Sequence, residues 1–184
     1  IKSEGNKYMA TEQQFVTLGS GDLYITQYSG VMPEDEEFET EENKIGSIKA
    51  GAELSYSPET YEVTNGYGIV LKRFITKEEV IFKSGLLTWN LDVLSKLCMG
   101  GDVTKTSTKS VLKIGGKRRG IKKVALRFIH TMDDGKTIKV TMVGTPSAGF
   151  TLAFNPDEET VIDAEFTAMA QDTEGTLVLI EKEI

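Results

Sequence analysis

The sequence predicts a mainly β protein with antiparallel strands, one short flanking α-helix and long extended loops. Three observations predict this class. Nine segments are rich in Val, Ile, Thr, Tyr and Phe and are bounded by Gly, Pro, Asn or Asp. Residues 162–168 alternate between apolar and polar side chains, which is typical of a half-buried strand. Only about residues 90–99 carry both the start and the stop signals of a helix.

The predicted strands, in chain order, are Leu23–Tyr28, Tyr61–Arg73, Glu79–Thr88, Val111–Ile114, Ile121–Met132, Lys136–Val143, Ala148–Phe154, Thr160–Ala170 and Thr176–Glu181. Two further segments, Ser29–Lys44 and Asp102–Ser110, look extended and irregular because Pro, Ser, Thr and charged residues dominate them. Gly66-Tyr67-Gly68 is predicted to be a turn.

The turn around Asp133-Asp134-Gly135 predicts a hairpin between two long β-like segments. A two-residue loop would place Phe128 opposite Thr141. A three-residue loop, with Gly135 in the left-handed conformation, would place Phe128 opposite Val140 and collect the apolar residues on one face. We prefer the second register for that reason. The other face is then mixed and could meet water or a partner subunit.

The predicted helix has a complete set of end signals. Asn90 suits the N-cap, Asp92 lies in the first turn and Lys96 falls near the end, before Gly100-Gly101. The apolar stripe formed by Leu91, Leu94 and Cys98 must dock on the sheet, because a helix of about ten residues is marginal alone.

Length and composition indicate one domain, residues 1–184, and exclude several classes of chemistry. The chain has 39% hydrophobic residues and no apolar run near the roughly 20 residues that span a bilayer, so we predict no membrane span. A lone Cys98 excludes an internal disulfide framework and a multi-cysteine zinc site. A lone His130 makes a His-dependent triad hard to build. We interpret both as structural residues, and we predict no cofactor, no metal and no enzymatic reaction.

Charge is distributed very unevenly along the chain. The net charge of −7 divides into −9 over residues 1–70, +10 over 71–130 and −8 over 131–184. Seven acids fall between Glu34 and Glu42, and nine Lys or Arg with no acid fall between Val103 and Met132. Unlike patches on one chain favour docking of copies on each other, since complementary potentials orient an encounter. The basic stretch lacks interleaved aromatic residues, which argues against a base-stacking surface for nucleic acid.

Four stretches together resemble the tail tube (major tail) proteins of tailed bacteriophages, including tubes of contractile phage-tail-like particles. They are residues 51–56 (GAELSY), 82–89 (FKSGLLTW) with the helix after them, 160–168 (TVIDAEFTA) and 174–180 (EGTLVLI). The resemblance implies a β-sandwich or partial barrel with a flanking helix. It also implies that six copies form a ring and that stacked rings form a hollow tube through which genomic DNA enters the host. Further partners would be sheath, tape-measure, tail-terminator and baseplate proteins, in the virion tail and in the host cytoplasm during assembly.

The resemblance and the charge pattern together lead to expected roles for three groups of residues. Long loops typically bridge one ring to the next, so the ring-stacking candidates are Pro33, Glu34, Asp35, Glu36, Glu37, Phe38, Glu39, Glu41 and Glu42. The complementary basic contact candidates are Lys105, Lys109, Lys117, Arg118, Arg119, Lys122 and Lys123. A bore that passes DNA should not bind phosphates, so the lumen candidates are the acids Asp163 and Glu165. The alternatives are another virion β-protein, such as a capsid decoration or baseplate subunit, and a carbohydrate- or protein-binding β-domain.

Overall fold

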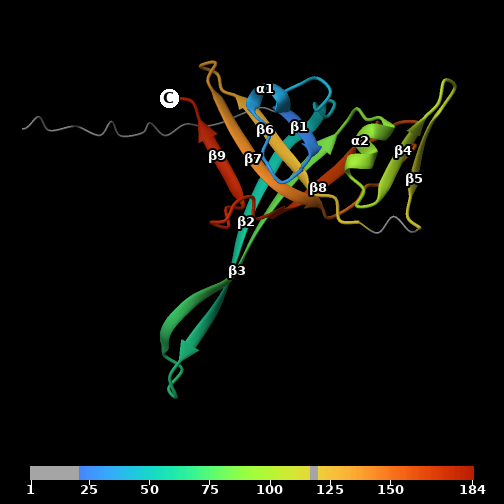
Figure 1. The fold of residues 1–184 in the computed structure, drawn as a ribbon. Helices are drawn as coiled ribbons and strands as arrows, with labels where there is room; N and C mark the ends of the chain where they lie inside the picture. The colour runs from blue at the N-terminus through green and yellow to red at the C-terminus, as the bar shows by residue number, and fades with distance from the viewer. Residues whose placement is uncertain (1–20, 117–119) are drawn as a thin grey trace, which may run out of the picture.

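The computed structural model describes residues 21–116 and 120–184 and is built mainly from antiparallel strands (Figure 1). The strands are β1 (Asp22–Gln27), β2 (Ile48–Thr64), β3 (Val70–Leu86), β4 (Gly101–Lys105), β5 (Ser110–Ile114), β6 (Val124–Thr131), β7 (Thr137–Pro146), β8 (Ile162–Met169) and β9 (Val178–Lys182). The helices are α1 (Asp35–Phe38) and α2 (Leu91–Lys96). The predicted class, mainly β with a short flanking helix, is confirmed, and α1 is an addition to it.

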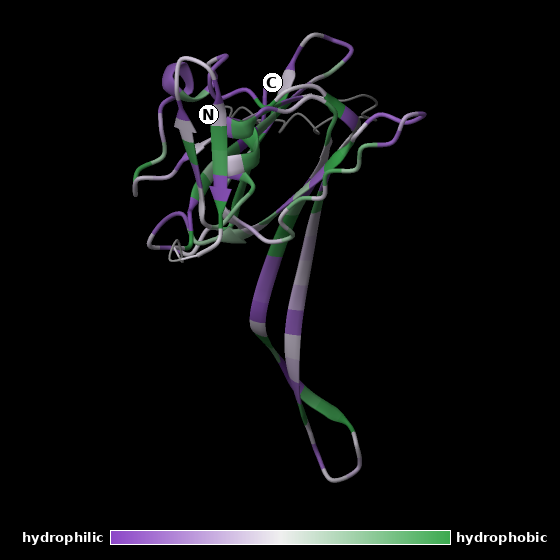
Figure 2. Cartoon of the chain, turned by 90° about the vertical axis from the view of Figure 1, so that its right-hand side faces the viewer, coloured by the Kyte–Doolittle hydropathy of each residue, from purple (hydrophilic) through white to green (hydrophobic). Residues whose placement is uncertain are grey.

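Seven strands form one sheet: six follow the order β1-β6-β7-β8-β3-β2, and β9 pairs with the first half of β7. Figure 2 shows that the sheet is curved. A separate hairpin, β4–β5, packs with α2 against the main sheet. All of these pairings are antiparallel. The domain therefore consists of one large antiparallel sheet with α2 and the β4–β5 hairpin packed beside it.

The predicted three-residue hairpin loop between β6 and β7 is confirmed. Phe128 pairs with Val140 and Leu126 with Met142. The loop closes through a 2.8 Å hydrogen bond from the Met132 amide to the Lys136 carbonyl. Gly135 adopts φ 83°, the left-handed conformation that the loop requires and that glycine tolerates.

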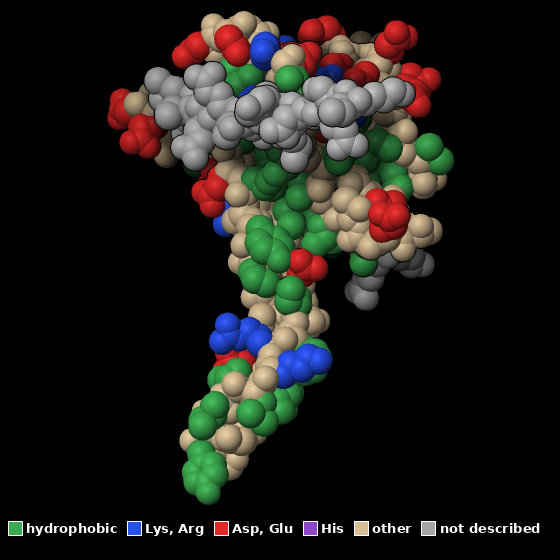
Figure 3. All heavy atoms as spheres, turned by 90° about the vertical axis from the view of Figure 1, so that its left-hand side faces the viewer, with side chains coloured by type: hydrophobic (Ala, Val, Ile, Leu, Met, Phe, Trp, Pro, Cys, Tyr) green, Lys and Arg blue, Asp and Glu red, His purple; other side chains and the backbone are tan. Residues whose placement is uncertain are grey.

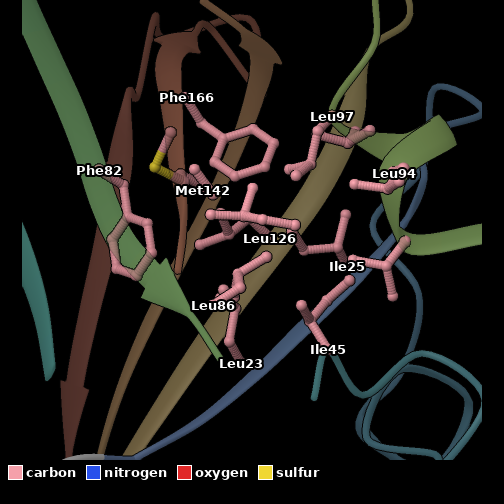
Figure 4. Packing of buried hydrophobic residues seen from close by; sticks show 14 residues of the cluster. Leu23, Ile25, Ile45, Phe82, Leu86, Leu94, Leu97, Leu126, Met142 and Phe166 are labelled. Atoms are coloured by element: carbon pink, nitrogen blue, oxygen red, sulfur yellow. The ribbon is translucent and has the colours of Figure 1, made fainter. Parts of the chain in front are cut away.

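The main core lies between the concave face of the sheet and α2 (Figure 4). Phe82 from β3, Met142 from β7 and Phe166 from β8 are fully or almost fully buried there, against Leu94 of α2. The alternation predicted for β8 is confirmed, because Ile162, Ala164 and Phe166 are buried while Asp163 is exposed. Burial of these side chains supplies the main stabilisation of the fold.

Helix α2 begins as predicted but is shorter than about ten residues. The Asn90 side chain caps it by accepting a 2.9 Å hydrogen bond from the Val93 amide. Helical geometry ends at Lys96, and a turn carries Leu97 and Cys98 into the core. The Lys96 ammonium donates a 2.7 Å hydrogen bond to the Ile25 carbonyl of β1. Burial of this ammonium lowers the Lys96 pKa.

The second face of the sheet is covered by the chain's own acidic segment. Ser29–Lys44 was expected to be extended and irregular, but it contains α1 and lies over β1 and β6. Phe38 of α1 is fully buried and packs with Tyr24 and Ala125. The mixed face of the hairpin, expected to meet water or a partner, therefore meets α1.

Two strand predictions and one loop prediction are wrong. Tyr61–Arg73 is not one strand but the two ends of β2 and β3 with a turn between them, because Asn65 to Gly68 reverses the chain. Ala148–Phe154 is not a strand; Gly149 has φ 69° and the segment is largely exposed. Asp102–Ser110 was expected to be extended and irregular, but its first part belongs to β4, because pairing with β5 satisfies the backbone groups there. The remaining predicted strands exist with bounds shifted by a few residues or, for Glu79–Thr88, as the end of the longer β3.

Candidate functional site

The most prominent surface feature is a long two-stranded arm, residues 57–79, that leaves the sheet (Figure 1). β2 and β3 stay paired along it, but β8 stops pairing with β3 at Ile81. Every residue from 56 to 78 except Asn65 is exposed. At about 3.3 Å per residue the arm reaches roughly 30 Å beyond the sheet.

The tip of the arm is an ordered turn. The Asn65 side-chain oxygen accepts hydrogen bonds of 3.0 Å from the amides of Tyr67 and Ile69. The Gly68 amide bonds the Asn65 carbonyl, also at 3.0 Å, and Gly68 has φ 79°. These bonds hold the backbone of the turn, so the tip presents Tyr67, 92% exposed, from a preformed loop.

The outer half of the arm carries many apolar side chains that nothing in the described chain covers (Figure 3). The cross-strand pair Tyr61 and Phe74 is 63% and 45% exposed. The other exposed apolar residues of this half are Val63, Tyr67, Ile69, Val70, Leu71 and Ile75. Monomeric proteins rarely expose a large contiguous apolar surface, so this surface is typical of an interaction site.

Polar contacts between the two strands of the arm fix their register, although the side chains that make them stay exposed. Arg73 bonds Glu62, the Tyr56 hydroxyl donates to Glu78 at 2.7 Å, and Lys77 lies 3.5 Å from Glu59. Exposed pairs of this kind contribute little to stability. Their effect is to hold the two strands in one alignment, so that the apolar residues keep fixed positions.

The acidic ring-stacking candidates divide into two sets. Asp35, Phe38 and Glu39 are bound within the chain, Phe38 by burial and the two acids by Arg127 and Lys139. The residues left exposed toward solvent are Glu34, Glu36, Glu37, Glu41 and Glu42, while Pro33 is half-buried. Only the second set remains available to another molecule.

The charges under α1 explain how the segment is held. Arg127 is buried on β6, and its guanidinium lies 2.8 Å from Glu39 and over the Phe38 ring at 4.8 Å. Lys139 on β7 bonds Asp35 at 2.9 Å and Glu39 at 2.6 Å. Hydrogen bonds from Lys139 and then Arg127 hold the Asp35 pKa below its usual value. Burial would lower the Lys139 pKa, but the bonds to Glu39 and Asp35 outweigh it and raise it.

Of the described basic contact candidates, Lys105 and Lys109 lie on the β4–β5 hairpin, away from α1 (Figure 1). Lys105 pairs with Asp92 at 2.7 Å, and Lys122 bonds the Gly101 carbonyl. Lys109 and Lys123 are exposed. Lys117, Arg118 and Arg119 lie outside the described residues. The backbone of Lys123, however, lies next to the start of the acidic segment, because its carbonyl accepts a 3.0 Å hydrogen bond from the Tyr28 amide.

The lumen candidates line an open depression of about 810 Å³ where β2, β3 and β8 lie side by side. Asp163 is exposed there. Glu165 pairs with Lys83 of β3 at 3.2 Å and accepts a 3.0 Å hydrogen bond from the Ser147 hydroxyl. These two bonds, Lys83 first, lower the Glu165 pKa. The two acids therefore share a surface, but Lys83 neutralises one of them.

No concentration of catalytic groups marks the described residues. Both candidate reactive side chains are buried: His130 on β6 is 8% exposed and Cys98 is 7% exposed. Burial raises the Cys98 pKa, which keeps the thiol protonated and inert. Within residues 21–116 and 120–184, no group of three or more His, Cys, Asp or Glu is arranged to hold a metal ion. None of the helices in this part of the chain has the length and hydrophobicity needed to cross a membrane.

Sequence reasoning missed the arm because its strands are rich in β-forming residues on both faces. The Asn65-Gly66-Tyr67-Gly68 turn inside the predicted strand Tyr61–Arg73 was the signal that could have revealed it.

A scan against protein-family models gives no match, and a search of curated proteins gives none either.

Proposed function

We propose that the chain is a structural, non-enzymatic subunit that assembles with copies of itself into stacked rings, forming a tail tube that conducts double-stranded DNA. The observation that carries the proposal is the arm, residues 57–79, which projects an apolar surface from an otherwise well-packed domain. A side chain such as Ile75, 62% exposed, loses contact with water only if another molecule covers the arm.

The separation of charge supports contacts between copies. The exposed acids of the α1 segment and the basic β4–β5 region lie at different ends of the domain. An interface that joins one patch to a different patch on the next copy is heterologous, and such interfaces close into rings or extend as filaments. Complementary charge would set the orientation of each added copy more than its affinity.

In this proposal the arm makes the main contact between rings, and the exposed acids Glu34, Glu36, Glu37, Glu41 and Glu42 make an accessory one. The acidic segment alone projects little, because Phe38 and the Arg127 contacts tie it to its own sheet. The depression with Asp163 and Glu165 faces the bore, where an acidic or neutral wall lets a duplex pass without binding. Sheath, tape-measure, terminator and baseplate partners would contact the finished tube.

The test is assembly of the purified full chain. We expect negative-stain electron microscopy and light scattering to show six-fold rings or hollow tubes as the protein concentration rises. A chain that stays monomeric at every concentration and salt condition overturns the proposal and favours a decoration, baseplate or ligand-binding domain. A tube whose bore is lined by residues 117–123 would overturn the placement of charge but not the assembly.

A further inference from the structure

Among the described residues, no strand pairs with the side of β9 that faces away from β7, and we call this position beside β9 the lane. β7 is paired along one side by β8 at residues 143–146 and by β9 at residues 138–142, so the two strands lie end to end. β3 continues the sheet beyond β8 only as far as Ile81. If β3 ran straight, its preceding residues would lie beside β9; instead they leave as the arm. In the described chain, β9 therefore pairs with β7 alone.

The backbone of β9 can accept another strand. The Glu183 amide donates to the Thr137 carbonyl of β7 at 3.0 Å. In an antiparallel ladder, alternate residues point their N–H and C=O groups to opposite sides. Ile180, three residues earlier, therefore points its backbone groups away from β7, toward the open lane.

The apolar side chains of β9 that border the lane are exposed. Ile180 is 59% exposed although it lies on the same sheet face as the core residue Met142. Leu179, on the opposite face, is 45% exposed. A strand added beside β9 would cover Ile180 in the way that β3 covers β8, and would remove an aggregation-prone edge.

The charge around the lane complements the arm. The segment 172–183 carries four acids and one base: Asp172, Glu174, Glu181, Glu183 and Lys182. The β3 side of the arm, residues 70–77, carries Lys72, Arg73 and Lys77, and the β2 side carries Glu62, which pairs with Arg73, and Glu59, which pairs with Lys77. Lys72 takes part in none of these ion pairs, so it can face the acids beside β9 and favours docking of the β3 side of the arm over docking of another acidic surface.

We propose that the β3 side of the arm, residues 70–77, adds as an antiparallel strand beside Ile180 of β9 in a second copy of the chain. The added strand takes the direction that β3 has relative to β8. The arm of one copy then occupies, in the second copy, the position beside β9 that the second copy's own β3 does not occupy. Strand addition supplies main-chain hydrogen bonds, and Ile180 supplies apolar contact. The contact is heterologous, so each copy donates one arm and accepts another. This inference rests on the self-assembly proposed above and names the partner surface of the arm.

Cross-linking between differently labelled copies tests the lane directly. In a Cys98→Ser background, one protein carries Ile75→Cys in the arm and a second carries Ile180→Cys in β9. After assembly of the mixture, a short bis-maleimide should give at least ten times more dimer than it gives with either protein alone. The matched control replaces Ile180→Cys by Ile114→Cys on β5, which is similarly exposed at 58% but remote from the lane.

The outcomes separate this inference from the proposed function. Tubes or rings without dimer above the Ile114→Cys control overturn the lane and leave self-assembly standing. Equal dimer from the Ile75→Cys protein alone indicates arm-to-arm contact and also overturns it. A wild-type chain that never assembles overturns both.

A backbone variant gives a second readout. Ile180→Pro removes an N–H that faces the lane and no bond of the β7–β9 ladder, so we expect assembly to slow at least tenfold. Ile180→Thr keeps that N–H, so its assembly rate should stay within about threefold of that of the wild-type chain. Equal assembly by the two variants would overturn strand addition.

Discussion

The guanidinium of Arg127 and the carboxylate of Glu39 lie 2.8 Å apart and join the central sheet to the acidic segment. The arginine side chain is only 6% exposed, whereas Glu39 and Asp35 reach toward solvent at 25% and 62%. A buried arginine needs partners for its charge, and the acidic run supplies them from 88 residues away. Part of the acidic run is therefore a fold-stabilising element, and only the remainder is surface.

Replacing Arg127 should destabilise the fold more than replacing its neighbour. Arg127→Met keeps apolar volume but removes the donor to Glu39, so we expect a loss of about 2 kcal/mol in the free energy of unfolding. Lys139→Met also removes a partner of Glu39, but its side chain is more exposed, at 22%, and it should cost less than half as much. Urea unfolding measures both, and equal losses would contradict the role given to burial.

Stability should fall in acid partly through Asp35. Hydrogen bonds from Lys139 and then Arg127 lower the Asp35 pKa below the ordinary 3.8. The resulting stabilisation is present above the unfolded-state pKa and is lost as the pH falls through the folded-state pKa. Asp35→Asn should therefore be less stable than wild type at pH 6, with the difference shrinking below about pH 4.

Urea midpoints between pH 6 and 2.5 check this expectation. Glu36→Gln on the same helix removes one carboxylate that makes no contact with Arg127 or Lys139, and so controls for net charge. A difference between Asp35→Asn and wild type that stays constant down to the lowest pH would contradict the prediction.

The sequence predicted most local structure because the signals for it are local. The β6–β7 register follows from Gly135 and the apolar face that only one loop length creates. Likewise Asn90 alone indicates where α2 begins, and its side chain makes the predicted cap. The contact between Arg127 and Asp35 could not be predicted, since it depends on tertiary packing across 92 residues.

The arm was hidden for a different physical reason. Strand prediction relies on one buried and one wet face, but residues 56–78 are exposed on both faces apart from Asn65. Its apolar residues follow no alternation between a buried and an exposed face, because the described part of the chain buries neither face of the arm. The acidic run drew attention through its charge, although burial of Phe38 shows that it folds back onto the domain.

Loss of the α2 cap should have a modest and specific effect. Asn90→Ala leaves the Val93 amide without its 2.9 Å acceptor and should cost about 1 kcal/mol. Asn90→Asp retains an oxygen acceptor at the N-cap and should stay within a few tenths of a kcal/mol of wild type. Thermal unfolding followed by circular dichroism compares the two. Equal destabilisation by both variants would show that the amide nitrogen of Asn90, rather than its oxygen, stabilises the helix start.

Reversing the exposed acids of α1 should weaken stacking without unfolding the protein. Glu36→Lys with Glu37→Lys leaves Asp35 and Glu39 in place, so we expect an unchanged urea midpoint but slower assembly that depends less on salt. Asp157→Lys with Glu158→Lys makes the same charge change in an exposed loop elsewhere and is the control. Light scattering at several salt concentrations measures the rates. Assembly equal to that of wild type would remove the accessory role assigned to this segment.

Removing the apolar pair in the arm should separate assembly from folding. Tyr61 and Phe74 are cross-strand partners that remain 63% and 45% exposed in the monomer, so Tyr61→Ser with Phe74→Ser should change the free energy of unfolding by less than about 1 kcal/mol. In the assembled tube the same side chains would be covered, and their loss should raise the concentration needed for assembly at least tenfold, or about 1.4 kcal/mol.

The matched control for the arm is Met99→Ser with Phe154→Ser, which removes two apolar side chains that are 45% and 78% exposed but lie outside the arm and outside the proposed contact candidates. Sedimentation at increasing protein concentration gives the threshold for both variants. If the control raises the threshold as much as the arm variant, general surface hydrophobicity drives association. If only the arm variant raises it, association depends on residues 57–79, because the two variants remove similar apolar side chains and differ mainly in where those side chains lie.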